Sequence, residues 1–203
     1  MTVGILDYGV GNIGSLVNMF RKIDVPARLV SQPEEIDSVS RLVLPGVGSF
    51  DNAMTKLIAG RFEEPLGAFV KAGRPFLGIC LGMQLLLDSS EEGTMSGLGF
   101  VPGSSRRFRP AEFPGLRVPH MGWNTVSAAH ASPMFDRIEE ENRFYFVHSY
   151  RVECVSEKDV LAWTTYGAPF HSMIARDNVT GAQFHPEKSH VFGMTLLENW
   201  SAS

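Results

Sequence analysis

Cys80 lies between two glycines in the stretch GICLGMQ, where an apolar run gives way to helical spacing. A strand that ends at Ile79 and a helix that begins at Leu81 or Gly82 leave Cys80 alone on a tight turn, and small residues there prevent crowding. The N–H groups that open such a helix stabilise a thiolate and offer donors to an oxyanion. Cys80 is therefore a candidate nucleophile; the alternative is a core cysteine between packing glycines.

A second stretch, GAQFHPEKS, supplies groups that would activate this cysteine. Its apolar alternation predicts a strand that ends where Pro186 removes a backbone donor. His185 and Glu187 then lie two positions apart, which suits a base and the carboxylate that orients it. A histidine at a strand end more often has a structural role. We identify His185 as a candidate base because the same chain contains the candidate nucleophile Cys80.

Strand-like and helix-like segments alternate through the first half of the chain. Residues 2–7 form a β-prone run, a glycine-rich turn follows, and residues 13–20 repeat apolar side chains at helical spacing. The same criteria predict strands at 27–30, 41–45 and 75–79, and helices from about residue 52 and over 62–70. This order is typical of an α/β unit with a parallel sheet.

The pattern changes from about Phe100. Short β-like pieces occupy residues 144–152, 161–165, 171–175 and 180–184, and a last helix is predicted at 190–200. The sequence therefore predicts an α/β fold with a mixed central sheet, parallel in its first half and antiparallel in its second, with helices on both faces. No repeat or linker interrupts it, so we expect a single domain over residues 1–203.

Composition restricts the classes of partner. The net charge is −4, and the one basic cluster, Arg106 to Arg109, is short, so no nucleic-acid face is expected. No apolar run is long enough to span a membrane, and the N-terminus does not resemble a signal peptide, so a cytoplasmic location is expected. In that reducing compartment Cys80 and Cys154 are expected as free thiols, Cys154 with a structural role.

Together, GICLGMQ and QFHPEKS resemble the signature of class I glutamine amidotransferases, which have a flavodoxin-like α/β fold. Three more stretches, LPGVGSF, VPHMGWN and YFVHSY, are similar to the family's subunits that serve histidine biosynthesis. The resemblance runs from about Asp7 to Trp200.

The resemblance implies a Cys-His-Glu triad and glutamine as substrate. Cys80 attacks the side-chain amide, His185 acts as base and then acid, and Glu187 orients it, through a γ-glutamyl thioester. Oxyanion donors are implied at the Leu81 N–H and in the loop after the third strand, Pro45-Gly46-Val47-Gly48. The implied substrate-binding residues are Gln84, Glu92, His148, Ser149 and Tyr150. Neither a cofactor nor a metal is implied.

A partner is implied as well. In the family's histidine-pathway members the ammonia passes, within a heterodimer, to a (β/α)8 cyclase that makes imidazole glycerol phosphate and an aminoimidazole carboxamide ribotide. The implied interface comprises Asn12, Pro119, His120, Met121, Gly122, Trp123 and Asn124, with the mouth of the Gly46–Gly48 loop. Trp123 is the expected anchor, although a core tryptophan is the commoner role, and partner binding is expected to switch activity on.

Three other functions stay open at this point. A paralogous subunit would feed ammonia to a cyclase-like partner in the synthesis of surface-polysaccharide sugars. A non-catalytic docking subunit would be marked by a broken triad, whereas Cys80, His185 and Glu187 are all present. A free-standing amidase or γ-glutamyl hydrolase would have no use for the VPHMGWN stretch.

Overall fold

The computed structural model describes residues 1–109 and 115–203. Its first part alternates strands and helices, as the sequence predicts. The strands are β1 (Val3–Leu6), β2 (Ala27–Val30), β3 (Arg41–Gly46) and β4 (Phe76–Cys80), and the helices are α1 (Ile13–Lys22), α2 (Phe50–Ala59), α3 (Glu63–Lys71) and α4 (Leu81–Leu85). Every residue of β1, β3 and β4 is buried, which is typical of parallel strands covered on both faces.

The second part is mainly β-structure. It contains β5 (Ser89–Ser90), β6 (Gly103–Arg107), β7 (His120–Asn124), β8 (Ser127–Ala128), β9 (Phe144–His148), β10 (Tyr150–Cys154), β11 (Val160–Tyr166), β12 (Ala168–Arg176) and β13 (Val179–Ala182), followed by α5 (His190–Ala202). Short 3-10 turns occupy Pro33–Ser38, Pro133–Phe135, Glu157–Asp159 and Pro186–Lys188.

The main sheet is mixed. Its order is β2-β1-β3-β4-β13-β12-β10-β6-β5, and β11 pairs with β12 and β8. The strands from β2 to β13 run parallel, and β12, β10 and β6 follow antiparallel. Ala182 of β13 lies opposite Ile79 of β4, so the ends of these two strands meet. This register brings the segments that carry Cys80 and His185 together at the carboxyl ends of two neighbouring central strands.

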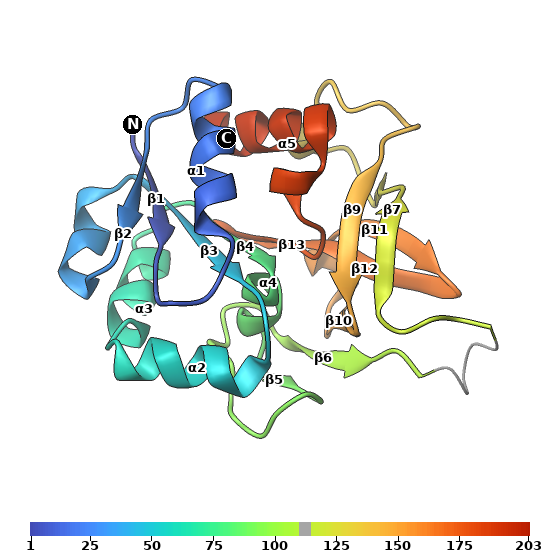
Figure 1. Cartoon of the computed structure of the whole chain (residues 1–203), viewed down its shortest axis with the longest axis horizontal. Helices are drawn as coiled ribbons and strands as arrows, with labels where there is room; N and C mark the ends of the chain where they lie inside the picture. The colour runs from blue at the N-terminus through green and yellow to red at the C-terminus, as the bar shows by residue number, and fades with distance from the viewer. Residues whose placement is uncertain (110–114) are drawn as a thin grey trace.

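Helices cover both faces of the sheet (Figure 1). On one face α1 and α5 bury Leu16, Phe20 and Trp200 in one hydrophobic cluster. On the other, α2, α3 and α4 bury Leu57, Leu66 and other side chains in a second cluster. Two cores therefore hold the sheet between them, and the strand ends that carry chemistry are fixed from both sides.

A separate two-stranded sheet, β7 with β9, departs from the prediction. Residues 144–152 were expected to form one strand, but the chain turns at Ser149, so β9 pairs with β7 while β10 joins the main sheet. Neither β6 nor β7 was predicted, because β6 has no β-branched or aromatic residue and β7 contains a glycine and an asparagine, which are depleted in strands.

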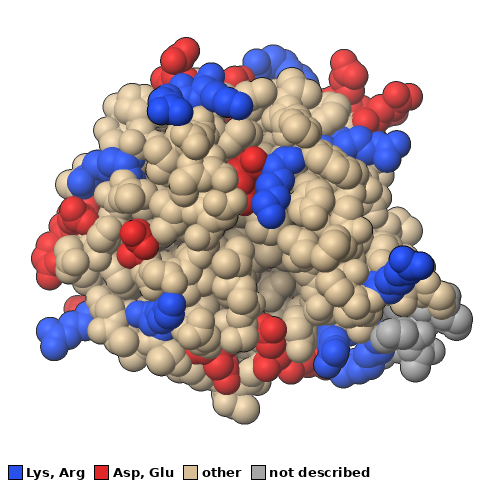
Figure 2. Space-filling view, viewed as in Figure 1, with Lys and Arg blue, Asp and Glu red and all other residues tan. Residues whose placement is uncertain are grey.

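Figure 2 shows acidic and basic side chains interspersed on the face of Figure 1, separated by wide uncharged areas. Arginines of the basic cluster pair with acids: Arg106 with Glu153 at 2.8 Å, and Arg109 with Glu91 at 3.0 Å. Within the described ranges, none of the helices has the length and apolar character needed to cross a membrane.

Candidate active site

The turn at Cys80 has the geometry of a nucleophile elbow. Cys80 ends β4, its backbone has φ 55° and ψ −110°, and α4 begins at the next residue. A Cβ at Gly78 would lie 2.6 Å from the carbonyl oxygen of Gly82, and a Cβ at Gly82 would lie 1.9 Å from that of Leu44. Both glycines are therefore required by the close approach of strand and helix, and Cys80 sits in strained backbone at their centre.

His185 and Glu187 form a buried pair. The His185 Nδ1 and Glu187 Oε1 atoms are 2.7 Å apart, and the side chains are 3% and 2% exposed. Burial alone would lower the pKa of His185, but the interactions with Cys80 and Glu187 outweigh it and raise the pKa to about 10. The imidazole is thus held by a carboxylate at Nδ1, while its buried Nε2 has no hydrogen-bond partner among the described residues. Both His185 and Cys80 line one cavity.

The position of His185 depends on β9 as well as β13. The β13 strand ends at Ala182, earlier than the apolar alternation predicts, and the His185 N–H then donates to the Tyr145 carbonyl. Ser189 fixes the same corner, since its hydroxyl donates to the His185 carbonyl at 2.6 Å and accepts from the Tyr145 N–H.

Gln183, which the sequence analysis did not single out, lies next to the cysteine. It is fully buried, and its Nε2 lies 3.9 Å from Cys80 Sγ while its Oε1 accepts from Gln84 Nε2 at 3.1 Å. The sequence offered one signal for this position: Gln183 lies two residues before His185, so in an extended chain both side chains point to the same side. Gln183 and Gln84 thus form a polar floor beside the sulfur.

A cavity of about 320 Å³ opens in front of Cys80. Besides Cys80 and His185, its lining includes the five residues for which substrate contact was expected: Gln84, Glu92, His148, Ser149 and Tyr150. Leu81, Val47 and Gly48 complete the wall near the sulfur, whereas Glu187 lies behind His185. The volume suits a small polar molecule of the size of an amino acid.

The expected oxyanion loop is partly strand. Pro45 and Gly46 belong to β3, where Gly46 lies opposite Cys80, and only Val47 and Gly48 lie beyond it. A Cβ at Gly46 would lie 2.8 Å from the Gly82 backbone nitrogen, so this glycine allows β3 to pack against the start of α4.

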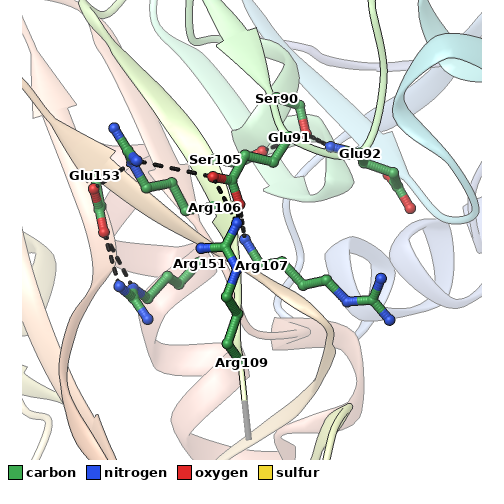
Figure 3. A network of polar contacts seen from close by, with 9 residues as sticks. All are labelled: Ser90, Glu91, Glu92, Ser105, Arg106, Arg107, Arg109, Arg151 and Glu153. Atoms are coloured by element: carbon green, nitrogen blue, oxygen red, sulfur yellow. Dashed lines mark hydrogen bonds and ion pairs between the residues drawn. The ribbon is translucent and has the colours of Figure 1, made fainter. Parts of the chain in front are cut away.

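Glu92 is held at the rim of the cavity by its neighbours. Its Oε2 accepts the Phe50 N–H at 2.8 Å. Burial, and to a smaller extent Asp51, raises its pKa, against the lowering effect of the Phe50 hydrogen bond. The adjacent Glu91 points the other way, toward the arginines of β6 (Figure 3), and its Oε2 accepts the Arg107 N–H at 2.9 Å. The two carboxylates therefore have different surroundings: Glu92 lines the cavity, and Glu91 ties its segment to β6.

A chain of hydrogen bonds joins β7 to the cavity wall. His148 Nδ1 donates to the Tyr150 carbonyl at 2.7 Å, so its Nε2 accepts from His120 Nδ1 at 3.0 Å. His120 Nε2 in turn accepts from Asn124 Nδ2 at 3.3 Å. Burial lowers the pKa of His148 to about 3 and that of His120 to about 4, so both rings are neutral near pH 7.

The expected partner residues divide between surface and interior. Met121 and Trp123 are 62% and 44% exposed, and Asn12 and Pro119 are exposed as well, whereas Gly122 and Asn124 are partly buried. His120 is only 2% exposed, because side chains alternate along β7 and its own points inward. His120 was expected in the interface with the partner, but its side chain lies in the interior, beneath the exposed Met121 and Trp123.

In the part of the chain that the structure describes, no three His, Cys, Asp or Glu side chains gather as metal ligands do. At the cavity, the structure places a cysteine at a helix start, a histidine in the same lining, and a carboxylate that holds the histidine, which are residue types that acyl transfer uses.

The α/β sheet and the elbow at the end of β4 are features on which a comparison with known enzymes can be made. Residues 4–202 match the family described as glutamine amidotransferase class-I, and the chain belongs to that family.

Curated relatives carry a narrower description. The chain is 46% identical over 199 residues to imidazole glycerol phosphate synthase subunit HisH 2 of Methanococcus maripaludis, with 98% of each chain covered. It is 45% identical over 203 residues to imidazole glycerol phosphate synthase subunit HisH of Bdellovibrio bacteriovorus, again with 98% of each covered.

Solved structures agree on the fold. A structure of PurLQS from Thermotoga maritima superposes with a TM-score of 0.76 at 15% identity, covering 99% of this chain and 97% of that one. A glutamine amidotransferase crystal structure gives a TM-score of 0.74 at 17% identity, with 98% of each chain covered. The predicted amidotransferase fold, with its mixed sheet and helices on both faces, is confirmed.

Proposed function

We propose that this chain is the glutaminase subunit of an imidazole glycerol phosphate synthase. It hydrolyses glutamine to glutamate and ammonia and delivers the ammonia to a cyclase subunit. The observation that carries the chemistry is that His185 lines the same cavity as Cys80 while its Nδ1 lies 2.7 Å from Glu187 Oε1. The pathway is supported by the names of relatives that match the chain over nearly its whole length. The unit proposed to act in this way spans residues 1–203, and its cytoplasmic location stays a prediction.

The proposed reaction begins with proton transfer inside the pair. His185 takes the Cys80 thiol proton, which its raised pKa favours, and Glu187 stabilises the imidazolium. The thiolate attacks the carboxamide carbon of glutamine, whose ammonium group lies at Glu92. Negative charge then develops on the carbonyl oxygen, toward the Leu81 N–H and an N–H of the Val47–Gly48 segment.

The second half of the reaction returns the cysteine. His185 gives its proton to the amide nitrogen, ammonia leaves, and a γ-glutamyl thioester remains on Cys80. Water, deprotonated by His185, attacks the thioester carbon, and the C–S bond breaks to release glutamate and restore the thiol. The proposed cycle contains no oxidation or reduction step, so it is complete without a redox cofactor.

Glutamine hydrolysis by the purified chain, alone and with the cyclase subunit plus that subunit's nucleotide ligand, tests the proposal. We expect slow hydrolysis by the chain alone and stimulation of at least about tenfold by the partner. Strong hydrolysis whose rate does not change when the partner is added would indicate a free-standing amidase. Labelling of Cys80 by a glutamine-analogue electrophile without stimulation would indicate another synthase, such as one for polysaccharide sugars. A chain that is neither labelled nor active would be a docking subunit.

The exposed pair Met121 and Trp123 is the proposed anchor of the cyclase. The Trp123 indole is stacked on His190, with ring centroids 5.3 Å apart, so it is already held in one orientation in the free chain. We expect Trp123→Ala to raise the Kd of the complex about tenfold, because truncating an aromatic anchor commonly costs more than about 1 kcal/mol. Titration calorimetry measures the Kd. Leu29→Ala, at a residue 42% exposed on β2, is the control and should leave it unchanged. A Kd unaltered by Trp123→Ala would remove this residue from the interface.

A further inference from the structure

Tyr8, to which the proposed reaction gives no role, contacts the end of β3 just before the segment proposed to supply an oxyanion donor. It follows β1, it is 7% exposed, and its hydroxyl donates to the Pro45 carbonyl at 2.8 Å. Pro45 is the residue at which the Pro45–Gly48 segment begins. The contact therefore joins two chain segments at the carboxyl ends of neighbouring parallel strands, β1 and β3.

The backbone pattern of β3 explains why this carbonyl needs a side-chain donor. The Leu42 N–H donates to the Pro75 carbonyl on the β4 side, and successive residues of a strand alternate between its two neighbours. The Pro45 carbonyl therefore faces β1, whose pairing with β3 has already ended at Ile5 and Val43. An unsatisfied buried carbonyl is costly, and the Tyr8 hydroxyl takes the place of the missing strand.

The packing around the chain becomes looser just after Gly46. The Pro45–Gly46 peptide is held by Tyr8 on its oxygen and by the packing of Gly46 against α4. Val47 is 44% exposed, and Gly48 has φ +93° with no atom within 4 Å of a built Cβ. The segment after Gly46 is therefore exposed and loosely surrounded, while Tyr8 holds the carbonyl that precedes it.

The segment that carries Tyr8 also has an outward-facing side. Gly9 and Asn12 are exposed, and Asn12 is one of the residues expected to meet the cyclase. Lys56 of α2 donates to the Gly9 carbonyl at 2.7 Å, and a Cβ at Gly11 would lie 3.1 Å from the Pro45 side chain. The loop of residues 8–12 therefore contacts both β3, before the oxyanion segment, and α2, after it.

The Tyr8 hydroxyl keeps its proton under all ordinary conditions. Burial, and after it the nearby Cys80, raises the pKa of this phenol far above its usual value. It therefore stays a hydrogen-bond donor while charge develops in the site.

We propose that Tyr8 is a positioning residue for glutamine hydrolysis, whose hydroxyl holds the Pro45 carbonyl so that the Val47–Gly48 segment presents an N–H to the oxyanion. Through the loop of residues 8–12 it also links that segment to the surface around Asn12. The inference rests on the proposed function and adds to it a residue that positions the oxyanion segment.

The test compares Tyr8→Phe with the wild-type chain in complex with the cyclase. Phenylalanine preserves the ring and removes one hydrogen bond, so we expect kcat for glutamine hydrolysis to fall about tenfold, with KM within twofold. 4-Aminophenylalanine at position 8 restores a donor and should recover most of the rate. Alkylation of Cys80 by iodoacetamide, followed by peptide mass spectrometry, should proceed at the wild-type rate, because that reaction needs no oxyanion donor.

The matched control is Tyr166→Phe, which also removes a tyrosine hydroxyl that donates to a carbonyl, that of Arg117, at 2.7 Å. It should retain the wild-type kcat. If Tyr8→Phe fails to fold, Lys56→Met removes the other tie to this loop and should lower the stimulated kcat in the same direction.

The outcomes separate this inference from the function beneath it. A stimulated wild-type chain with an equally fast Tyr8→Phe variant overturns the role of Tyr8 and leaves the glutaminase assignment intact. A rise in KM with unchanged kcat, or a slow variant that the amino analogue does not rescue, also overturns it. A wild-type chain without glutaminase activity overturns both.

Discussion

Replacing Cys80 with alanine is expected to abolish glutamine hydrolysis while ammonia-dependent synthesis by the complex persists. Without the sulfur no thioester forms, and the loss should reach at least about 10⁴-fold, since the remaining donors and binding groups cannot supply a nucleophile. The cyclase takes ammonia directly, so added ammonium salt at alkaline pH should sustain its product. Assays of glutamate release and of product formation, on the same preparation, measure the two activities.

Cys154→Ala is the matched control for this experiment. Cys154 ends β10 and is half-buried outside the glutamine cavity, and burial, with a smaller effect of Asp159, raises the pKa of its thiol to about 12. This variant should keep both activities. If Cys80→Ala loses ammonia-dependent synthesis together with glutamine hydrolysis, the idea that the chain only feeds ammonia to its partner fails.

The second large effect is expected from Glu187→Gln. The amide keeps the size of the side chain but can offer an N–H to His185 Nδ1, which favours the tautomer with its proton on Nε2 and leaves no acceptor for the Cys80 proton. We expect kcat to fall by at least about 10²-fold with KM within twofold, because Glu187 lies behind His185 and does not line the cavity.

Steady-state kinetics of the stimulated complex give both constants for this variant. Glu198→Gln is the control, since this carboxylate on α5 pairs with Arg137 at 2.9 Å, away from the cavity, and the chemical change is the same. A rise in KM with little change in kcat would instead assign Glu187 to substrate binding.

The sequence predicted the local geometry of the nucleophile because that geometry depends on neighbours in the chain. Two glycines around Cys80 predict a sharp turn, and the structure has one with φ 55°. The buried strands and helices of the first half were predicted for the same reason, because a period of two or 3.6 is visible within a dozen residues.

Contacts that depend on the order of strands in the sheet were harder to predict from the sequence. Nothing in the alternation around Ala182 indicates that β13 lies beside β4 rather than at an edge, yet this register is what brings His185 to Cys80. The hydrogen bond from Tyr8 to Pro45 spans 37 residues and has no local signal. His120 was expected at the surface because the strand that turns it inward, β7, was not predicted.

The left-handed backbone at Cys80 also determines where this protein can be made more stable. A cysteine at φ 55° costs about 1–3 kcal/mol, which the surrounding sheet offsets. Selection for thermal stability alone would favour glycine at position 80, which adopts that conformation freely, and would remove the proposed nucleophile. The proposed role of Cys80 makes the elbow a point of stability–activity trade-off, and gains in melting temperature should be sought on the helices that cover the sheet rather than at the ends of β4 and β13.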